Sequence, residues 1–249
     1  MIILKSPREI NIMEKANKIV AETHEFLAEK IAPGITTQEI DRWGEEFIRN
    51  KGAEPSFKGY RGYPASVCVS INEEVVHGIP SPERLLEDGD IVSLDIGAFY
   101  KGFHGDAART HAVGNIAPRA EQLIKITEES FAQALKKANV GSRLTDMSHA
   151  VQSHAEKNNF SVVREYVGHG IGNKMHEDPQ IPNFGPPGKG PVLKKGMTLA
   201  LEPMLNVGGF EVETLADDWT VVTKDRSLSA HYENTIAITD EGPLVLSKI

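Results

Sequence analysis

The chain has 249 residues, of which 40% are hydrophobic and 25% are charged, and its formal net charge is -8. This is the composition of an ordinary globular protein, and it excludes a disordered chain, a collagen-like repeat and a disulfide-rich scaffold. The acidic excess also argues against nucleic acid or an anionic membrane as the main partner, because both are bound through basic residues.

The N-terminal part of the chain has the pattern of two helices followed by strands. Ser6 with Glu9 is expected to form a capping pair at the start of the first helix, and the second helix is expected to begin at Thr36 or Thr37, with Glu39 as its capping partner. Strand-forming residues then dominate from residue 66 to residue 113.

The rest of the chain repeats this order of elements. Apolar periodicity predicts helices over about residues 119–138 and 144–158, and strands are expected from residue 161 onwards. We therefore expect a single α+β domain that includes all 249 residues and consists of two related halves, approximately residues 1–115 and 116–249.

Matched spacing supports this internal repeat. Gly34 and Gly141, which precede the second helix of each half, are 107 residues apart, and so are the strand residues Asp95 and Glu202. The two halves are therefore expected to place their acidic strand residues in related positions.

Four acidic residues lie in apolar, strand-like runs, where carboxylates are disfavoured. They are Asp95, Asp106, Glu202 and Glu233. Alternate residues of a strand share a face, so Asp95 lies on the side of Ser93 and away from Leu94, and the other acids likewise share a face with small or hydroxylated residues. We expect these four side chains to point into a space that can hold a ligand.

Two of these acids are close in the chain. A hairpin turn over Tyr100-Lys101-Gly102, centred between residues 100 and 101, would place Asp95 directly opposite Asp106. Two carboxylates held in this way need a shared proton or a cation between them. The other two acids and a nearby histidine favour the cation.

Three of the nine histidines lie in glycine-rich or turn sequences: His77, His169 and His176. The segment Gly168-His169-Gly170-Ile171-Gly172 is the most specific, because missing side chains would let a metal or a substrate approach the backbone. We expect His24 to lie on the polar face of its helix, and His104 and His231 to be structural.

One histidine with four carboxylates is a hard, oxygen-rich set of metal ligands. It suits Mn(II), Fe(II) or Co(II), with Mg(II) less favoured, whereas a structural zinc site would need more cysteines than the single Cys68. Carboxylates in this number can bridge two ions about 3.5–4 Å apart, which is the arrangement of hydrolases that activate water.

Longer motifs, taken in order, resemble type I methionine aminopeptidases over essentially the whole chain. The motifs are Pro33-Gly34-Ile35-Thr36-Thr37, Asn72-Glu73, His77-Gly78-Ile79-Pro80, Leu94-Asp95-Ile96, His104-Gly105-Asp106, Gly168-His169-Gly170-Ile171-Gly172, Leu201-Glu202-Pro203-Met204 and Ala230-His231-Tyr232-Glu233-Asn234-Thr235. The resemblance implies the pita-bread fold, in which two related α/β halves form one antiparallel-rich sheet covered by helices.

The resemblance also implies how metals would be held. The ligands would be Asp95, Asp106, His169, Glu202 and Glu233. Asp106 and Glu233 would bridge two divalent ions, with Asp95 on one ion and the other two ligands on the second. The ions would be Co(II), Mn(II) or Fe(II), with Zn(II) or Ni(II) as further options. Glu233 would also help the bridging water to attack the substrate.

The remaining site residues are assigned by the same resemblance. The outer histidines His77 and His176 would be catalytic and would contact the peptide group of the substrate. The methionine pocket would be formed by Tyr60, Tyr63, Cys68 and Trp219, with Phe57 and Met175 at its more variable edges.

The implied activity is hydrolysis of the first peptide bond of a nascent protein, which removes the N-terminal methionine when the second residue is small. The expected partners are nascent polypeptide N-termini at the ribosome, without direct nucleic-acid or membrane binding, and the expected state is a monomer. With one cysteine, no membrane-length apolar run and no basic leader before an apolar segment, we expect a cytoplasmic protein.

Three other functions fit parts of the pattern. A proline-specific peptidase of the same fold would usually carry an additional N-terminal domain, which does not fit before Pro33. A catalytically inactive, peptide-binding relative would have lost metal ligands, whereas all five candidates are present here. A structural metal-binding protein would not account for the pair His77 and His176.

Overall fold

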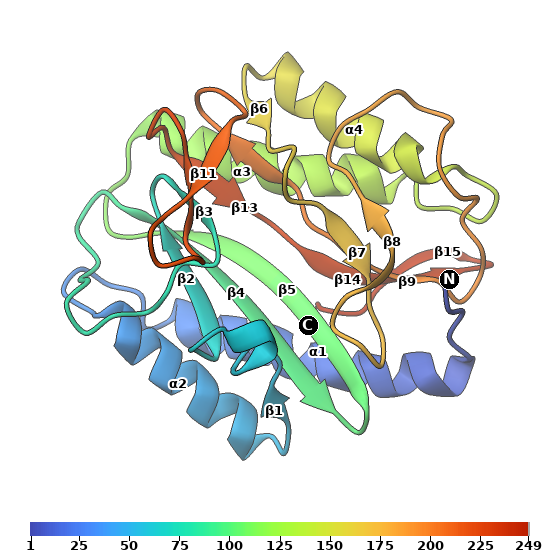
Figure 1. Ribbon diagram of the computed structural model, residues 1–249, viewed down its shortest axis with the longest axis horizontal. Coiled ribbons are helices and arrows are strands. Elements are labelled where there is room, and N and C mark those ends of the chain that lie inside the picture. The colour runs from blue at the N-terminus through green and yellow to red at the C-terminus, as the bar shows by residue number, and fades with distance from the viewer. Residues whose placement is uncertain (249) are drawn as a thin grey trace.

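Helices occur in two pairs, as the sequence predicts. The computed structural model describes residues 1–248, and its helices are α1 (Pro7–Ala28), α2 (Thr37–Asn50), α3 (Pro118–Leu135) and α4 (Leu144–Lys157), with a short 3-10 turn η1 (Tyr60–Gly62). Figure 1 shows α1 and α2 on one side of the strands and α3 and α4 on the other. The capping pairs form at the first two helices, where the Ser6 and Thr36 backbone N–H groups donate to the Glu9 and Glu39 carboxylates at 2.7 and 2.9 Å.

All strand pairing within residues 1–248 is antiparallel. The strands of the first half are β1 (Glu54–Pro55), β2 (Val67–Ile71), β3 (Glu74–Val76), β4 (Ile91–Tyr100) and β5 (Phe103–Ala112). Those of the second half are β6 (Ser161–Val162), β7 (Gly168–Gly170), β8 (Glu177–Ile181), β9 (Thr198–Leu201), β10 (Met204–Asn206), β11 (Val212–Thr214), β12 (Val221–Thr223), β13 (Ser229–His231), β14 (Asn234–Thr239) and β15 (Gly242–Val245). Two sheets carry most of the site: β4 lies between β2 and β5 in one, and the other has the order β15-β14-β9-β7-β8.

Backbone contacts recur between the halves at the offset of 107 residues. The Gly34 N–H donates to the Leu86 carbonyl at 2.8 Å, and the Gly141 N–H donates to the Leu193 carbonyl at 3.0 Å. Two isolated strand bridges keep the same offset: Thr36 with Leu85, and Arg143 with Val192. In both halves the loop before the second helix is therefore hydrogen-bonded to the loop that precedes a strand of the site, β4 in the first half and β9 in the second.

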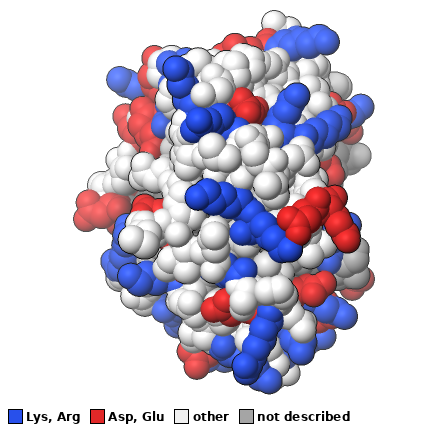
Figure 2. Space-filling model, turned by 90° about the vertical axis from the view of Figure 1, so that its right-hand side faces the viewer, with Lys and Arg blue, Asp and Glu red and all other residues white. Residues whose placement is uncertain are grey.

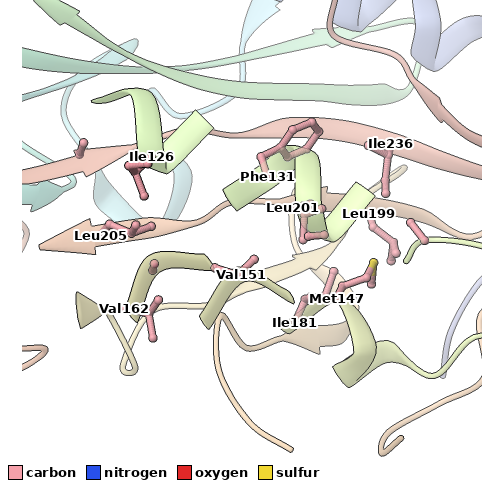
Figure 3. Packing of buried hydrophobic residues seen from close by; sticks show 14 of the residues in the cluster. Ile126, Phe131, Met147, Val151, Val162, Ile181, Leu199, Leu201, Leu205 and Ile236 are labelled. Atoms are coloured by element: carbon pink, nitrogen blue, oxygen red, sulfur yellow. The ribbon is translucent and has the colours of Figure 1, made fainter. Parts of the chain in front are cut away.

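The largest part of the core lies between the second helix pair and the second sheet. Figure 3 shows Phe131 of α3 and Met147 and Val151 of α4 packed against Leu199 and Ile236 of the strands. Fully burying each such side chain stabilises the folded state by roughly 1.5–3 kcal/mol. This packing holds β9 and β14 in place, and both strands adjoin site residues.

The register of the β4–β5 hairpin differs from the prediction. Tyr100 pairs with Phe103, so the turn consists of Lys101 and Gly102, whose φ angles are 48° and 89°. Two successive residues with positive φ form the tight turn that matches strand twist, and this moves the turn centre by one residue. Asp95 therefore pairs with Ala108, and it lies diagonal to Asp106 on the same face rather than directly opposite.

The prediction for His24 is also wrong. This side chain is only 6% exposed, because α1 packs on β5, and its Nε2 donates to the Ala107 carbonyl at 2.9 Å. A hydrogen bond to a carbonyl lets a neutral imidazole be buried at little cost, and a polar residue on a helix can therefore face the core.

The surface has mixed charge on the face shown in Figure 2, where lysine and arginine side chains lie beside carboxylates. Over residues 1–248, none of the helices combines the length and the apolar character needed to cross a bilayer.

Candidate metal centre and substrate pocket

The five predicted metal ligands line one cavity of about 280 Å³. Asp95 is on β4, Asp106 on β5 and His169 on β7, while Glu202 directly follows β9 and Glu233 directly precedes β14. The halves meet at this point, since the Glu233 N–H donates to the Ala108 carbonyl at 2.9 Å. The Thr235 hydroxyl also donates to the Asp106 carbonyl at 2.9 Å. Neither half contains the whole ligand set.

The ligand atoms are close enough to share a metal ion. One atom each of Asp106, His169 and Glu233 lie within 4.8 Å of one another. The Nε2 of His169 is 3.7 Å from Asp106 Oδ2 and 3.6 Å from Glu202 Oε1. Its Nδ1 donates to the Gly170 carbonyl at 2.9 Å, which fixes the tautomer and leaves the Nε2 lone pair free to bind a metal.

Burial and mutual repulsion raise the pKa values of these acids. Burial raises the pKa of Asp95 to about 7. The pKa of Asp106 rises well above its usual value because the group is buried and faces other carboxylates, and the pKa values of Glu202 and Glu233 rise for the same reasons. Burial lowers the pKa of His169 to about 3, so this ring is neutral at pH 7.

Unpaired oxygens indicate what these residues would hold. Buried oxygens of Asp95, Asp106 and Glu233 have no hydrogen-bond partner among the described residues. Four clustered carboxylates in a buried site cannot all ionise without a compensating positive charge. Together with a neutral imidazole they fit divalent metal ions.

The two outer histidines also line the cavity. His77 has a φ of 61°, a conformation uncommon for a residue with a side chain, and its ring meets Tyr166 and Trp219 edge-on at 5.6 and 6.2 Å. The Nδ1 of His176 is 2.9 Å from the Tyr60 hydroxyl, and its ring centre is 4.2 Å from that of His169. Burial lowers the pKa of each outer histidine to about 4, so both are neutral at pH 7.

An apolar pocket adjoins the carboxylates. Its lining includes all six predicted residues, Phe57, Tyr60, Tyr63, Cys68, Met175 and Trp219. Cys68 on β2 pairs directly with Asp95 on β4, so the pocket wall and a predicted metal ligand are neighbours in one sheet. Tyr63 is fixed by donating to the Gly78 carbonyl at 2.8 Å, and its ring packs edge-on against Trp219 at 5.1 Å.

Comparison with known proteins assigns the chain to a family. The profile of metallopeptidase family M24 matches residues 11–240. The methionine aminopeptidase of Clostridium perfringens is 59% identical over 249 residues, which is 100% of both chains. Methionine aminopeptidase 1 of Bacillus subtilis is 57% identical, again over 100% of both chains. The chain belongs to the methionine aminopeptidases of family M24. Methionine aminopeptidases are metallo-aminopeptidases, and a metallopeptidase family agrees with the cluster of candidate ligands described above.

Solved structures of this family confirm the predicted pita-bread fold. The methionine aminopeptidase of Thermotoga maritima superposes with a TM-score of 0.99 at 47% identity, and each chain covers 100% of the other. A prolidase from Pyrococcus furiosus reaches a TM-score of 0.81 at 24% identity, and the present chain covers 66% of its length. The likeness to the prolidase shows a shared fold and supports no proline-specific activity.

The glycines around His169 do not play the part predicted from the sequence. A Cβ on Gly168 would lie 2.5 Å from the Ala200 carbonyl oxygen, and one on Gly170 would lie 2.1 Å from the Asp178 carbonyl oxygen. These glycines let neighbouring backbone pack tightly against β7, rather than opening space for a metal or a substrate. They act by holding the strand that carries His169.

Two residues near the centre were not singled out from the sequence. His231, predicted to be structural, is 1% exposed, and its Nε2 is 3.7 Å from Glu202 Oε2. The guanidinium of Arg109 donates to the Glu233 carbonyl and, at 2.6 Å, to the Asn234 side chain. Arg109 could have been found from the sequence. Alternation along β5 places this charged residue on the apolar face of the strand, opposite to the face of Asp106, and a buried arginine needs partners.

Proposed function

We propose that this chain removes the N-terminal methionine from polypeptides whose second residue is small. The observation that carries the proposal is the pairing of Cys68 with Asp95, which sets an apolar pocket directly beside a buried cluster of carboxylates. A pocket of this kind would receive an unbranched thioether, since flexible methionine side chains fill irregular apolar space well.

We propose two divalent metal ions, held as the family resemblance implies. Asp106 and Glu233 would contact both ions, Asp95 would complete one site, and His169 and Glu202 would complete the other. Mn(II), Fe(II) and Co(II) suit this ligand set best, with Zn(II) or Ni(II) as alternatives. When bound, such ions lower the pKa of water and polarise a carbonyl group.

The protein groups then perform the remaining tasks. Glu233 would accept a proton from the attacking water. His77 and His176 are neutral at pH 7, so their N–H groups can hydrogen-bond the scissile amide and the oxygen that becomes negative in the transition state. The Tyr60 hydroxyl is hydrogen-bonded to Nδ1 of His176, so Nε2 of this ring is free to contact the substrate.

We also propose the setting in which the enzyme works. Its substrates would be nascent polypeptide N-termini at the ribosome, and it would act in the cytoplasm as a monomer without binding nucleic acid or membranes directly. The repeated contacts at an offset of 107 residues support a single catalytic domain of two related halves, approximately residues 1–115 and 116–249.

A matched peptide series tests the proposed specificity. With Mn(II) or Co(II) added to chelator-treated protein, Met-Ala and Met-Gly peptides should have a far higher kcat/KM than Met-Lys or Met-Phe peptides. N-formylated peptides should not be cleaved, because a blocked amino group loses its contact at the metal centre. Equal rates for Met-Gly and Met-Phe peptides, or rapid cleavage of Xaa-Pro peptides, would refute the proposal.

A further inference from the structure

Lys5 and Glu177 form an ion pair that is almost completely buried. Their side chains are 2% and 4% exposed, whereas those of the Lys195–Asp240 pair are 61% and 65% exposed. Removing two charges from water carries a large desolvation cost, and a buried pair survives only with well-placed partners. Neither Lys5 nor Glu177 is a proposed metal ligand, so the reaction as described gives this pair no task.

The pair joins the N-terminal segment to two loops of the site. The Lys5 N–H donates to the Gly196 carbonyl at 2.7 Å, just before β9. On the other side, Glu177 directly follows the outer histidine His176, and its Oε1 accepts a hydrogen bond from the Lys174 N–H at 3.2 Å. Glu177 is thus bound both to Lys5 and to the loop that carries His176.

Gly172 packs closely against the Lys5–Glu177 ion pair. A Cβ on Gly172 would lie 2.4 Å from the Lys5 Cε and 2.6 Å from Glu177 Oε1, so the third glycine of the His169 segment makes room for the pair. The Gly172 N–H donates to the Lys174 carbonyl at 3.1 Å, and its own carbonyl accepts from the His104 N–H at 2.9 Å. Residues 172–177, which are the loop and the first residue of β8, therefore pack directly against the pair.

His176 itself has few other anchors. It lies between β7 and β8 with part of its surface open to solvent, and its ring is held by the Tyr60 hydroxyl and by contact with His169. A ring held only by these two contacts keeps its position only if the backbone that carries it is also fixed. The adjacent residue, Glu177, begins β8 and pairs with Gly170, and its buried carboxylate is held by Lys5.

We propose that Lys5 is a positioning residue, which acts through Glu177 to hold His176 where it meets the scissile amide. This inference rests on the proposed function, because it assumes that His176 contacts the substrate. Lys5 acts from outside the cavity and touches neither the substrate nor the ions.

The test compares Lys5→Met with the matched control Lys195→Met. Lys5→Met should lower kcat for a Met-Ala peptide by about 10- to 100-fold, the usual effect of losing a residue that orients a catalytic group. KM and the dissociation constant for Mn(II) should not change, and amide hydrogen exchange should accelerate in residues 172–177. Lys195→Met should match the unaltered protein in all four measurements.

Three outcomes would overturn the proposal: an unchanged kcat, unchanged hydrogen exchange, or a parallel loss of Mn(II) affinity, which would mean that the pair supports His169 instead. If Lys5→Met does not fold, the same measurements are made on the double variant Lys5→Met/Glu177→Gln. This variant should fold because it leaves no unpaired buried charge. A wild-type kcat in that double variant would overturn the proposal. If the unaltered protein cleaves no methionyl peptide, the proposed function fails, while the exchange comparison still decides whether Lys5 fixes the loop.

Discussion

The two walls of the cavity are held in different ways. The metal wall, made of Asp95, Asp106, His169, Glu202 and Glu233, lies on strands or directly beside them, inside two hydrogen-bonded sheets. Most of the substrate wall, namely Tyr60, His77, His176 and Trp219, lies in turns and loops, and Cys68 on β2 joins this wall to the metal wall. The sheets fix where charge can be bound, and the loops fix where the peptide lies. Substitutions on the two walls should therefore separate metal binding from turnover.

The largest effect is expected on the metal wall. Asp106→Ala should lose Mn(II) affinity and lower kcat/KM by about 10³-fold or more, because several kcal/mol of transition-state stabilisation depend on the ions. Calorimetric titration with Mn(II) and a peptide assay measure both effects, and Asp240→Ala, which changes an exposed acid, is the control. Full activity in metal-free Asp106→Ala protein would contradict the dinuclear site.

A smaller loss is expected on the substrate wall. His77→Ala and His176→Ala should each lower kcat by about 10²–10³-fold, the effect of removing one preformed donor to the transition state, and should leave Mn(II) affinity unchanged. His149→Ala, on the exposed side of α4, is the matched control. Loss of metal from either variant with unchanged folding would show that metal binding and turnover do not depend on separate walls.

The pH dependence of metal binding should come from the carboxylates of the metal wall and not from the histidines of the substrate wall. Without metal the pKa of Asp95 is raised to about 7, so this group holds a proton at pH 6 and is ionised at pH 8, whereas the pKa of His169 is about 3 and this ring is neutral at both. Mn(II) must displace protons from the acids, so its affinity should fall about tenfold per released proton for each pH unit below 7. Calorimetry in buffers of different ionisation enthalpy gives the number of protons that Mn(II) binding releases. If no protons are released at pH 6, the raised pKa of Asp95 is wrong.

The smallest effect concerns the side chain of the first residue. An apolar pocket distinguishes shapes by roughly 1–3 kcal/mol per methylene, so Met-Ala should exceed Leu-Ala in kcat/KM by only about tenfold. Trp219→Ala should bring this ratio close to one without changing Mn(II) affinity. An unchanged ratio would show that Trp219 does not shape the pocket.

Much of the metal wall could be predicted from the sequence because carboxylates are disfavoured in apolar strands, and four of them occur here. Strand alternation places Asp95 with Ser93 on one face whatever the partner strand does. The register between Asp95 and Asp106 was mispredicted because the turn could be centred on either of two adjacent positions, and only the backbone angles of Lys101 and Gly102 decide between them.

Contacts between distant segments could not be read in this way. Nothing in the local sequence of Lys5 or Glu177 shows that residues 172 positions apart form a buried pair. The role of Gly172 was equally hidden, because a glycine required for close packing and one required for ligand access have the same local pattern.

The division of the ligands between the two halves has a consequence for how the enzyme is made. Residues 95 and 106 are synthesised long before residue 233, and the predicted ligand set is incomplete until Glu233 has paired with Ala108 across the junction of the halves. Contacts between residues so far apart in the chain are slow to form during folding. Metal loading would therefore follow completion of the fold, and a prematurely terminated chain would remain inactive instead of becoming an unregulated peptidase.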